Sequence, residues 1–368
     1  MRTRADDVRC PGREAPCQSA RSPDVAKRVS GLPEEGALIF EPKWDGFRAL
    51  VFRDGDEIVI QSRDQKSLNR YFPELMAPLA AALPARAVLD GEVVIARNGG
   101  LDFEALQMRI HPAASRVKTL SQELPASVVF WDLLALGDEN LTQVPFEERR
   151  QKLEAVLAGV KSPIHLTPAT RDRAVAADWF ERFEGAGFDG VMAKPARGVY
   201  EPNKRSMFKV KHERECDAVV AGFRWHKDGK GTAVGSLLLG LFDAEGVLHH
   251  VGVSASFTAE KRKELVTFLE PYRERALEGH PWAAWGGHAD ETGQRMPGAK
   301  SRWSGGKDLS WVALRPELVA EVAYDHMQGT RFRHTAHFKR WRTDKPPAEC
   351  TYAQLDAVAP QELAAIFG

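Results

Sequence analysis

The segment Glu41-Pro-Lys43-Trp-Asp45-Gly46-Phe-Arg48 holds the residues best suited to covalent chemistry. A lysine amine becomes a nucleophile only when its pKa falls, through burial or through neighbouring cations, and Arg48 could supply one such cation. The glycine would let a phosphate group approach the backbone closely. A strand end with a common Asp-Gly turn is the alternative interpretation. It does not explain why lysine, aspartate, glycine and arginine follow one another so closely.

Three further segments carry charged residues in related patterns. Asp90-Gly91-Glu92 is predicted at a turn between two apolar strands, and alone it fits a surface turn slightly better than a site. Asp189-Gly190 with Lys194 repeats the pattern of an acid followed by glycine and a strand. Lys209 and Lys211 alternate along a strand, so both ammonium groups share one face and repel each other unless an anion lies between them. A charged edge strand that resists aggregation is an equally good alternative.

A basic run with interleaved aromatic residues lies at the end of the last strands, at Phe338-Lys339-Arg340-Trp341-Arg342-Thr343-Asp344-Lys345. It is either a solvated strand end or a movable clamp for phosphates or nucleic acid. Gly185-Ala-Gly187-Phe-Asp-Gly190 matches the glycine pattern of dinucleotide-binding folds, which needs a strand before it and a helix after it. Here a helix is predicted before it and a strand after it, so dinucleotide binding is not expected.

These segments need strands and helices that bring them together. Two hairpins are predicted, one with its turn at Asp54-Gly55 and one at VLDGEVVIAR. Single strands are predicted at ALIFEPKW, SVVFWDLLAL, GVMAKP and MFKVKH, and helices at Pro73–Leu83, at Pro145–Leu157 and from Asp172. This mixture indicates an α+β fold over residues 22–212. After His212, short strands and one helix at 258–278 outline a small β-barrel of the oligonucleotide-binding kind.

The chain has 368 residues and a balanced charge, with 51 lysines and arginines against 51 acidic residues. No apolar run is long enough to span a bilayer, so no membrane association is expected. The four cysteines include no C-x-x-C pair, and residues 1–21 lack the apolar core of a secretory signal. We therefore predict a cytoplasmic protein with a disordered leader at 1–21. Zero net charge argues against a histone-like binder, but it permits a basic groove offset by acids elsewhere.

Taken in order, these segments resemble those of the ATP-dependent DNA ligases. That family belongs to the covalent nucleotidyltransferase superfamily, together with RNA ligases and mRNA capping enzymes. Lys-x-Asp-Gly-x-Arg at 43–48 is the most specific motif, and the resemblance covers nearly the whole chain from about residue 22. It implies a nucleotidyltransferase (adenylation) domain at 22–212, an OB-fold domain at 213–348 and a C-terminal tail at 349–368. The short segment before Lys43 makes the layout most similar to the compact bacterial ligases of the actinobacterial DNA ligase C type.

The resemblance also implies roles for individual residues. Lys43 is implied to attack the ATP α-phosphate and to carry AMP as a phosphoramidate. The implied nucleotide contacts are Arg48 and Arg63 (phosphates and the nick end), Glu92 (ribose or metal), Trp131 (stacking on adenine), and Lys209 and Lys211 (α-phosphate). Glu41 is implied to bind the nucleotide as well. The C-terminal element that orients the departing pyrophosphate when the barrel closes is implied at Arg340, Arg342, Asp344 and Lys345.

The implied cofactors are ATP and Mg²⁺ or Mn²⁺, with Glu92 and Asp189 as metal ligands. The family usually has glutamate where this chain has Asp189, and the shorter side chain is expected to reach the metal through water. The implied partner is nicked duplex DNA, held across the nick through its backbone and therefore without sequence specificity. A monomer acting in DNA repair is expected, with a repair polymerase or primase-type protein as a further partner.

Two other functions remain open from the sequence. An RNA ligase or a capping-type nucleotidyltransferase would use the same lysine chemistry, but the C-terminal Arg342-Thr343-Asp344-Lys345 favours a ligase over a capping enzyme. A non-catalytic barrel protein with a decayed nucleotide domain is the rival from another class. The retained Lys43, Lys209 and Lys211 weigh against it.

Overall fold

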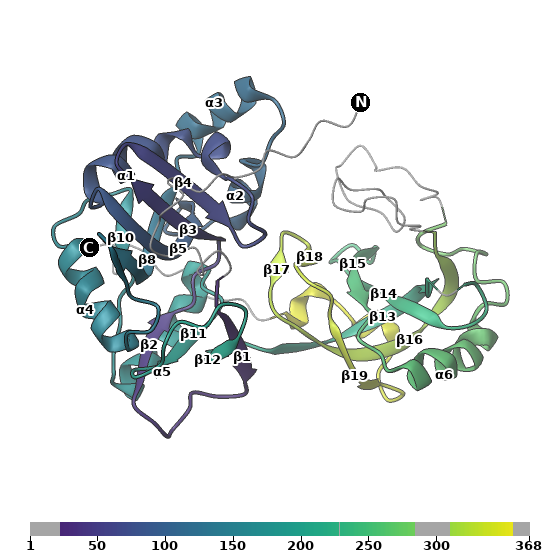
Figure 1. The fold of residues 1–368 in the computed structure, drawn as a ribbon. Coiled ribbons are helices and arrows are strands. Elements are labelled where there is room, and N and C mark those ends of the chain that lie inside the picture. Colours follow the sequence, from purple (N-terminus) through teal and green to yellow (C-terminus); the bar gives the residue numbers. More distant parts are fainter. Residues whose placement is uncertain (1–22, 228, 284–309, 356–368) are drawn as a thin grey trace. The chain divides into compact units, whose positions relative to one another are not determined.

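The computed structural model describes residues 23–227, 229–283 and 310–355. They form two compact units, which meet in the sequence between Lys211 and His212 (Figure 1). The predicted leader at 1–21 and most of the predicted tail at 349–368 lie outside the described residues. Within the described ranges, no helix combines the length and the apolar character that crossing a membrane requires.

The larger sheet of the first unit contains the predicted hairpin and the predicted buried strand. Its strands are β3 (Phe47–Asp54), β4 (Glu57–Ser62), β5 (Arg86–Val94), β8 (Ser127–Leu136), β9 (Glu139–Asn140) and β10 (Ile164–Leu166). They are ordered β10-β8-β5-β3-β4, with β9 beside β8. Alternate residues such as Ala49 and Val51 point into the main core of this unit, because successive side chains of a strand face opposite sides.

The second sheet of the first unit carries most of the charged motifs. Its strands are β1 (Val25–Val29), β2 (Leu38–Pro42), β11 (Val191–Pro195) and β12 (Arg205–Val210). They are ordered β1-β12-β11-β2. Strand β1 is parallel to β12, whereas β11 is antiparallel to both β12 and β2. A two-stranded ribbon, β6 (Ala96–Arg97) with β7 (Gly100–Leu101), completes the strands of this unit.

Among the described residues of this unit, five α-helices accompany the sheets, namely α1 (Met76–Ala82), α2 (Phe103–Met108), α3 (Ala114–Glu123), α4 (Phe146–Val156) and α5 (Arg173–Arg182). Helix α4 begins directly after Pro145 and packs against β8. Helix α5 is capped by the carboxylate of Asp172, which accepts a hydrogen bond from the backbone N–H of Ala174 at 2.7 Å. It packs against β2 (Figure 1). The helices expected in these regions are therefore present.

The hairpin predicted at VLDGEVVIAR is wrong. Strand β5 runs without a turn through Asp90, Gly91 and Glu92. A Cβ atom on Gly91 would lie 2.3 Å from the carbonyl oxygen of Val129 on β8. The glycine therefore permits a close approach of two strands at a β-bulge, and it does not form a turn.

The second unit is a closed barrel. Its strands are β13 (Arg214–Trp225), β14 (Val234–Phe242), β15 (Leu248–Ser254), β16 (Val312–Tyr324) and β19 (His337–Trp341), with the small hairpin β17 (Met327–Gln328) and β18 (Arg331–Phe332). The five long strands are ordered β15-β14-β13-β16-β19. A bridge between Ser254 and Ala336 joins the two outer strands, with Ala336 N donating to Val253 O at 2.9 Å. This bridge closes the sheet on itself.

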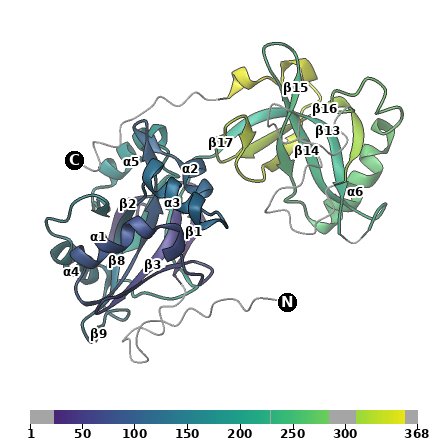
Figure 2. The ribbon, with the colours of Figure 1, turned by 90° about the horizontal axis from the view of Figure 1, so that it is seen from above.

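One helix, α6 (Ala259–Leu269), packs against β14 of the barrel (Figure 2). Its N-terminus is capped by Thr258, whose hydroxyl accepts from the N–H of Lys261 at 3.2 Å. The helix predicted at 258–278 is thus shorter than expected. A 3-10 turn at Glu270–Tyr272 follows it, because Pro271 cannot donate the hydrogen bond that would continue the α-helix.

Candidate active site

Lys43 follows the last residue of β2, and the backbone places it beside Asp189. The N–H of Lys43 donates to the carbonyl oxygen of Gly190 at 2.8 Å, and the N–H of Asp189 donates to the carbonyl oxygen of Lys43 at 2.9 Å. These bonds extend the pairing of β2 with β11 beyond the strand ends. As a result, the Nζ atom of Lys43 lies 2.5 Å from the Oδ2 atom of Asp189.

A second lysine shares the same carboxylate. The Nζ atom of Lys211 lies 2.9 Å from Oδ2 of Asp189. This arrangement depends on Gly190, which has a φ of +127° and whose added Cβ would lie 2.0 Å from the carbonyl oxygen of Val210. Only glycine lets the chain after Asp189 pass so close to the end of β12.

Glu92 reaches this group from β5 in the other sheet. Its Oε1 atom accepts a hydrogen bond from the N–H of Gly46 at 2.8 Å, which holds the Lys43 segment against β5. Burial raises the pKa of Glu92 to about 7, although the charge of Lys43 acts in the opposite direction. Glu92 is therefore a carboxylate close to Lys43 that gains or loses its proton near neutral pH.

The expectation of a depressed pKa for Lys43 is not met in the structure. Burial disfavours the charged amine, but the carboxylates of Asp189 and Glu92 outweigh it, so the pKa of Lys43 is raised. Burial disfavours the charged form of Asp189 as well, yet Lys43 and Lys211 hold its pKa well below the usual range. Lys43 is thus held as an ammonium ion, and Arg48 is not among the groups that shift its pKa most.

Arg48 is bound by two carboxylates. One NH group donates to the carbonyl oxygen of Asp24 at 2.6 Å, and the other lies 2.6 Å from the Asp24 carboxylate. Asp90 accepts from Nε at 3.0 Å and also pairs with the second NH group. Tyr200 donates its hydroxyl to Asp90 at 2.8 Å. The guanidinium lies 5.3 Å from the ring centroid of Trp131, so Arg48 is fixed beside the residue expected to stack on adenine.

Glu41 is a buried carboxylate with two cationic partners. The Nζ atom of Lys194 lies 2.6 Å away and the guanidinium of Arg150 lies 3.1 Å away. Lys194 also lies 5.4 Å from the ring centroid of Trp131. Lys194 therefore contacts both Glu41 and Trp131, the two residues here that are expected to bind the nucleotide.

Lys209 belongs to the same charged group. Its pKa is lowered by burial and further by the charges of Lys43 and Lys211. Arg63, in contrast, is exposed in the turn after β4. Within the described part of the chain, no hydrogen bond or ion pair joins its side chain to another residue. The structure thus brings together the lysines, Glu92 and Asp189, and it does not link Arg63 to them.

The C-terminal element lies on the barrel, held by two acids. Arg342 donates to the Asp217 carboxylate at 2.9 Å, and Lys345 lies 2.8 Å from the same carboxylate. Asp344 is the second partner of Arg342, at 2.8 Å. Arg340 pairs with Glu321 at 2.7 Å. The four predicted residues of this element therefore share a compact ion-pair network within the second unit.

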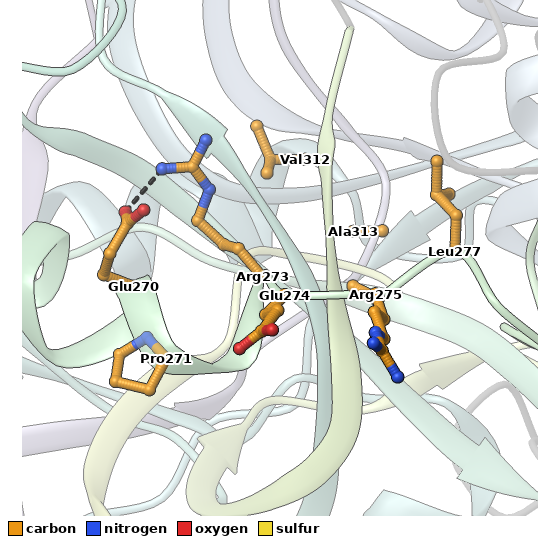
Figure 3. A pocket seen from close by; sticks show the side chains of 9 residues that line it. Glu270, Pro271, Arg273, Glu274, Arg275, Leu277, Val312 and Ala313 are labelled. Carbon is orange, nitrogen blue, oxygen red and sulfur yellow. Dashed lines mark hydrogen bonds and ion pairs between the residues drawn. The ribbon is translucent and has the colours of Figure 1, made fainter.

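The second unit also carries an open pocket (Figure 3). It is lined by the turn after α6 and by the first residues of β16, namely Glu270, Pro271, Arg273, Glu274, Arg275, Ala276, Leu277, Val312 and Ala313. Arg273 pairs with Glu270 at 2.5 Å. The pocket contains none of the residues expected to bind the nucleotide.

Sequence reasoning missed Asp24, Arg150, Asp217 and Glu321. Asp24 stands in a stretch without periodicity, so nothing in the sequence connects it with Arg48. Asp217 follows three charged residues, Glu213, Arg214 and Glu215, and one cysteine, near the start of a strand. A charged side chain is unusual near the start of an apolar strand. This feature of the sequence could have identified Asp217.

Comparisons with known proteins show the family of this chain. A family model described as "ATP dependent DNA ligase domain" matches residues 18–211, and one described as "ATP dependent DNA ligase C terminal region" matches residues 230–345. DNA ligase C of Mycobacterium tuberculosis is 52% identical over 349 residues, covering 93% of this chain and 96% of the relative. DNA ligase C2 of Mycolicibacterium smegmatis is 52% identical over 338 residues, covering 91% and 94%.

A solved Lig E DNA ligase has the same fold, with a TM-score of 0.52 at 16% identity, covering 87% of this chain and 99% of that chain. The predicted α+β adenylation domain followed by an OB-fold barrel is confirmed, as is the predicted resemblance to the DNA ligase C type. This chain belongs to the ATP-dependent DNA ligase family.

Proposed function

We propose that this chain uses ATP to seal nicks with 3′-OH and 5′-phosphate ends in duplex DNA, through AMP carried on Lys43. The observation that carries the proposal is the position of the Lys43 amine. It lies 2.5 Å from Asp189, beside Lys209 and Lys211, in the segment that the family model covers. A primary amine surrounded by further cations is suited to attack on a phosphate, since the cations neutralise the charge that repels a nucleophile.

The first step joins AMP to the protein. The Nζ lone pair of Lys43 attacks the α-phosphorus, an N–P bond forms, and the bond from phosphorus to the bridging oxygen of pyrophosphate breaks. Lys43 must pass a proton to water before it attacks, and in the structure it is paired with Asp189. Nucleotide binding therefore has to weaken this pair. The phosphates offer Lys209 and Lys211 a new partner, and a divalent cation held by Asp189 and Glu92 would compete with Lys43 for these carboxylates.

The next two steps use the DNA. An oxygen of the 5′-phosphate attacks the phosphorus of the lysyl-AMP, and the N–P bond breaks to return Lys43 as an amine. The 3′-OH then attacks the activated 5′-phosphate, the phosphodiester bond forms and AMP leaves. Each step is an in-line displacement at phosphorus, which depends more on positioning and charge neutralisation than on acid–base groups.

The residues near Lys43 fit a divalent metal that is bound together with phosphates. Among the described residues, no three potential ligands gather in one group, but the carboxylates of Asp189 and Glu92 both act on Lys43. Mg²⁺ is commonly held by one or two carboxylates, substrate phosphates and water, and Mn²⁺ takes similar oxygen ligands. Asp189 and Glu92 would hold the ion, which supplies neutralisation of the phosphate charge when it is bound.

We assign the pyrophosphate-orienting role to Arg340, Arg342, Asp344 and Lys345, and the adenylation and barrel domains to residues 22–212 and 213–348. Support for this role comes from the network around Asp217, which holds two of the cations at 2.9 and 2.8 Å. A role in DNA repair, a polymerase or primase-type partner and a monomeric state stay predictions from the sequence.

Two assays test the proposal. Incubation with α-labelled ATP and Mg²⁺ should leave the label on the wild-type protein and not on Lys43→Ala. Nicked DNA, nicked RNA and mixed junctions should then be compared side by side, and the DNA nick should be sealed fastest. Labelling of Lys43→Ala at the wild-type level, or labelling by GTP in place of ATP, would overturn the proposal. Sealing of RNA alone would favour the RNA ligase alternative.

A further inference from the structure

We propose that Arg28, on the edge strand β1, is an additional phosphate-binding residue of this active site. It would bind a phosphate group of a reacting partner, either the triphosphate of ATP or the 5′-phosphate at the nick. This inference rests on the proposed function, because it extends the group of cations around Lys43.

The strand register places Arg28 on the face of the sheet that carries the lysines. Arg28 is opposite Lys209, Lys209 is opposite Met192, and Met192 is opposite Glu41. Residues directly opposite on neighbouring strands point to the same face. These four side chains therefore form one row across β1, β12, β11 and β2, starting at Arg28.

The period of a strand connects this row with the nucleophile. Lys43 is two residues after Glu41, and Lys211 is two residues after Lys209, so both continue on the same face. Neighbouring strands are about 4.8 Å apart. Arg28 thus stands one strand beyond Lys209, within reach of an anion that Lys209 binds.

The charges of this group point to an anionic ligand. The described residues of the group include four cations, Lys43, Lys209, Lys211 and Arg28, and three carboxylates, Asp189, Glu92 and Asp45. Arg28 is among the cations whose charge lowers the pKa of Lys209, after burial, Lys43 and Lys211. The charges of these cations disfavour the protonated form of Lys209, and a bound anion would relieve that repulsion. An arginine is suited to a phosphate, since its planar fork can donate two parallel hydrogen bonds.

Strand β1 is firmly attached to the unit, so Arg28 does not depend on a loose segment. The N–H of Val25 donates to the carbonyl oxygen of Lys204 at 2.9 Å. Asp24, directly before the strand, is bound by Arg48 through both its carbonyl oxygen and its carboxylate, each at 2.6 Å.

The neighbouring lysine is a matched control. Lys27 carries the same charge on the same exposed strand, but it is opposite Phe208 and therefore points to the other face of the sheet. The experiment compares Arg28→Ala and Arg28→Lys with Lys27→Ala. Because both positions are exposed, all three variants should fold, which circular dichroism and thermal melting can check.

Two measurements distinguish ATP from nicked DNA as the source of the phosphate that Arg28 binds. Transfer of AMP from ATP to the protein is measured without DNA across a range of ATP concentrations. Binding of nicked DNA is measured with the protein already adenylated. We expect Arg28→Ala to raise the ATP concentration at half-maximal rate, or the Kd for nicked DNA, by about tenfold, the loss of one charge-assisted hydrogen bond. Arg28→Lys should recover part of the loss, and Lys27→Ala should match the wild type.

A change in the first reaction identifies the triphosphate as the ligand, and a change in the second identifies the 5′-phosphate. If Arg28→Ala equals Lys27→Ala in both, the inference is wrong. Failure of the wild-type protein to label Lys43 would instead remove the proposed function. In that case equilibrium binding of ATP to the same three variants still tests Arg28, because it requires no reaction.

Discussion

The amine of Lys43 and the carboxylate of Asp189 form an ion pair of 2.5 Å between two residues whose backbones are also hydrogen-bonded to each other. The pair is therefore built into the end of the sheet and does not depend on a chance rotamer. It keeps the proposed nucleophile charged. ATP binding, on this view, both supplies the phosphorus that is attacked and separates the amine from its partner.

This pair leads to a prediction for Asp189→Asn. Without the carboxylate, the raised pKa of Lys43 should fall, since Asp189 is the largest of the charges that favour the ammonium form. Lys43 should then react faster with a neutral amine reagent at neutral pH, without ATP or metal. Mass spectrometry of the modified peptide measures the rate. Equal rates in the variant and the wild type would contradict the assigned role of Asp189.

Asp24 gives a prediction for the pH dependence of stability. Burial raises its pKa to about 6, although Arg48 opposes the rise. The folded state thus holds the proton more tightly than the unfolded state. The contribution of Asp24 to stability is therefore fully present below its unfolded pKa of about 3.9 and is lost as the pH rises to about 6.

Asp24→Asn cannot titrate at this position, so its stability should lack that loss. Urea unfolding from pH 4 to pH 7, followed by tryptophan fluorescence, gives the free energy of unfolding of both proteins. We expect the wild type to lose stability relative to the variant as the pH rises to about 6, with a constant difference above it. A difference that is constant over the whole range would show that Asp24 has no raised pKa.

The site divides into residues that a sequence can identify and residues that it cannot. Lys43, Lys209 and Lys211 are recognisable because a short motif and a period of two are local properties. The direction of the pKa shift of Lys43 is not local, since it depends on Asp189, far along the chain. Arg48 likewise contacts Asp24 only because β1, the strand that begins directly after Asp24, pairs with β12.

Gly91 shows the same limit in the fold. An Asp-Gly dipeptide between apolar runs is typical of a turn, and the hairpin predicted there is wrong. The glycine is needed for the close approach of Val129 on β8. Contacts with a strand that comes later in the chain leave no local signal, so the difference between a turn and a close approach could not be predicted.

Gly190→Ala should be far more destabilising than a typical glycine substitution. The added Cβ would lie 2.0 Å from the carbonyl oxygen of Val210, a backbone atom that cannot move aside. Gly137→Ala is the control, since Gly137 also has a positive φ, of +58°, but no atom lies within 4 Å of an added Cβ. We expect a loss of about 1–2 kcal/mol for Gly137→Ala and of more than about 3 kcal/mol for Gly190→Ala.

Chemical denaturation of the two variants measures the difference. If Gly190→Ala folds at all, its adenylation rate should also fall, because Asp189 and Lys211 on either side of the clash would move. Equal losses of stability in the two variants would show that the backbone conformation, and not the contact with Val210, is what requires glycine.

Asp217 should affect one step of the reaction more than the others. It binds Arg342 at 2.9 Å and Lys345 at 2.8 Å, so Asp217→Asn releases two cations of the C-terminal element from a shared partner. That element is assigned to the pyrophosphate step. Transfer of AMP from ATP to Lys43 should therefore slow by about tenfold to a hundredfold, because misplaced groups lose the benefit of fixed orientation.

Sealing of a nick whose 5′-phosphate already carries AMP releases no pyrophosphate, so Asp217→Asn should leave it close to the wild-type rate. Single-turnover measurements of both reactions give the two ratios. Glu321→Gln removes the partner of Arg340 and a longer contact of Arg342 at 3.5 Å, but leaves Asp217 with Arg342 and Lys345, so it serves as the comparison. A merely structural role for Asp217 predicts a different result, since a distorted barrel would slow both reactions alike. The split between the two rates therefore distinguishes positioning of the C-terminal element from support of the fold.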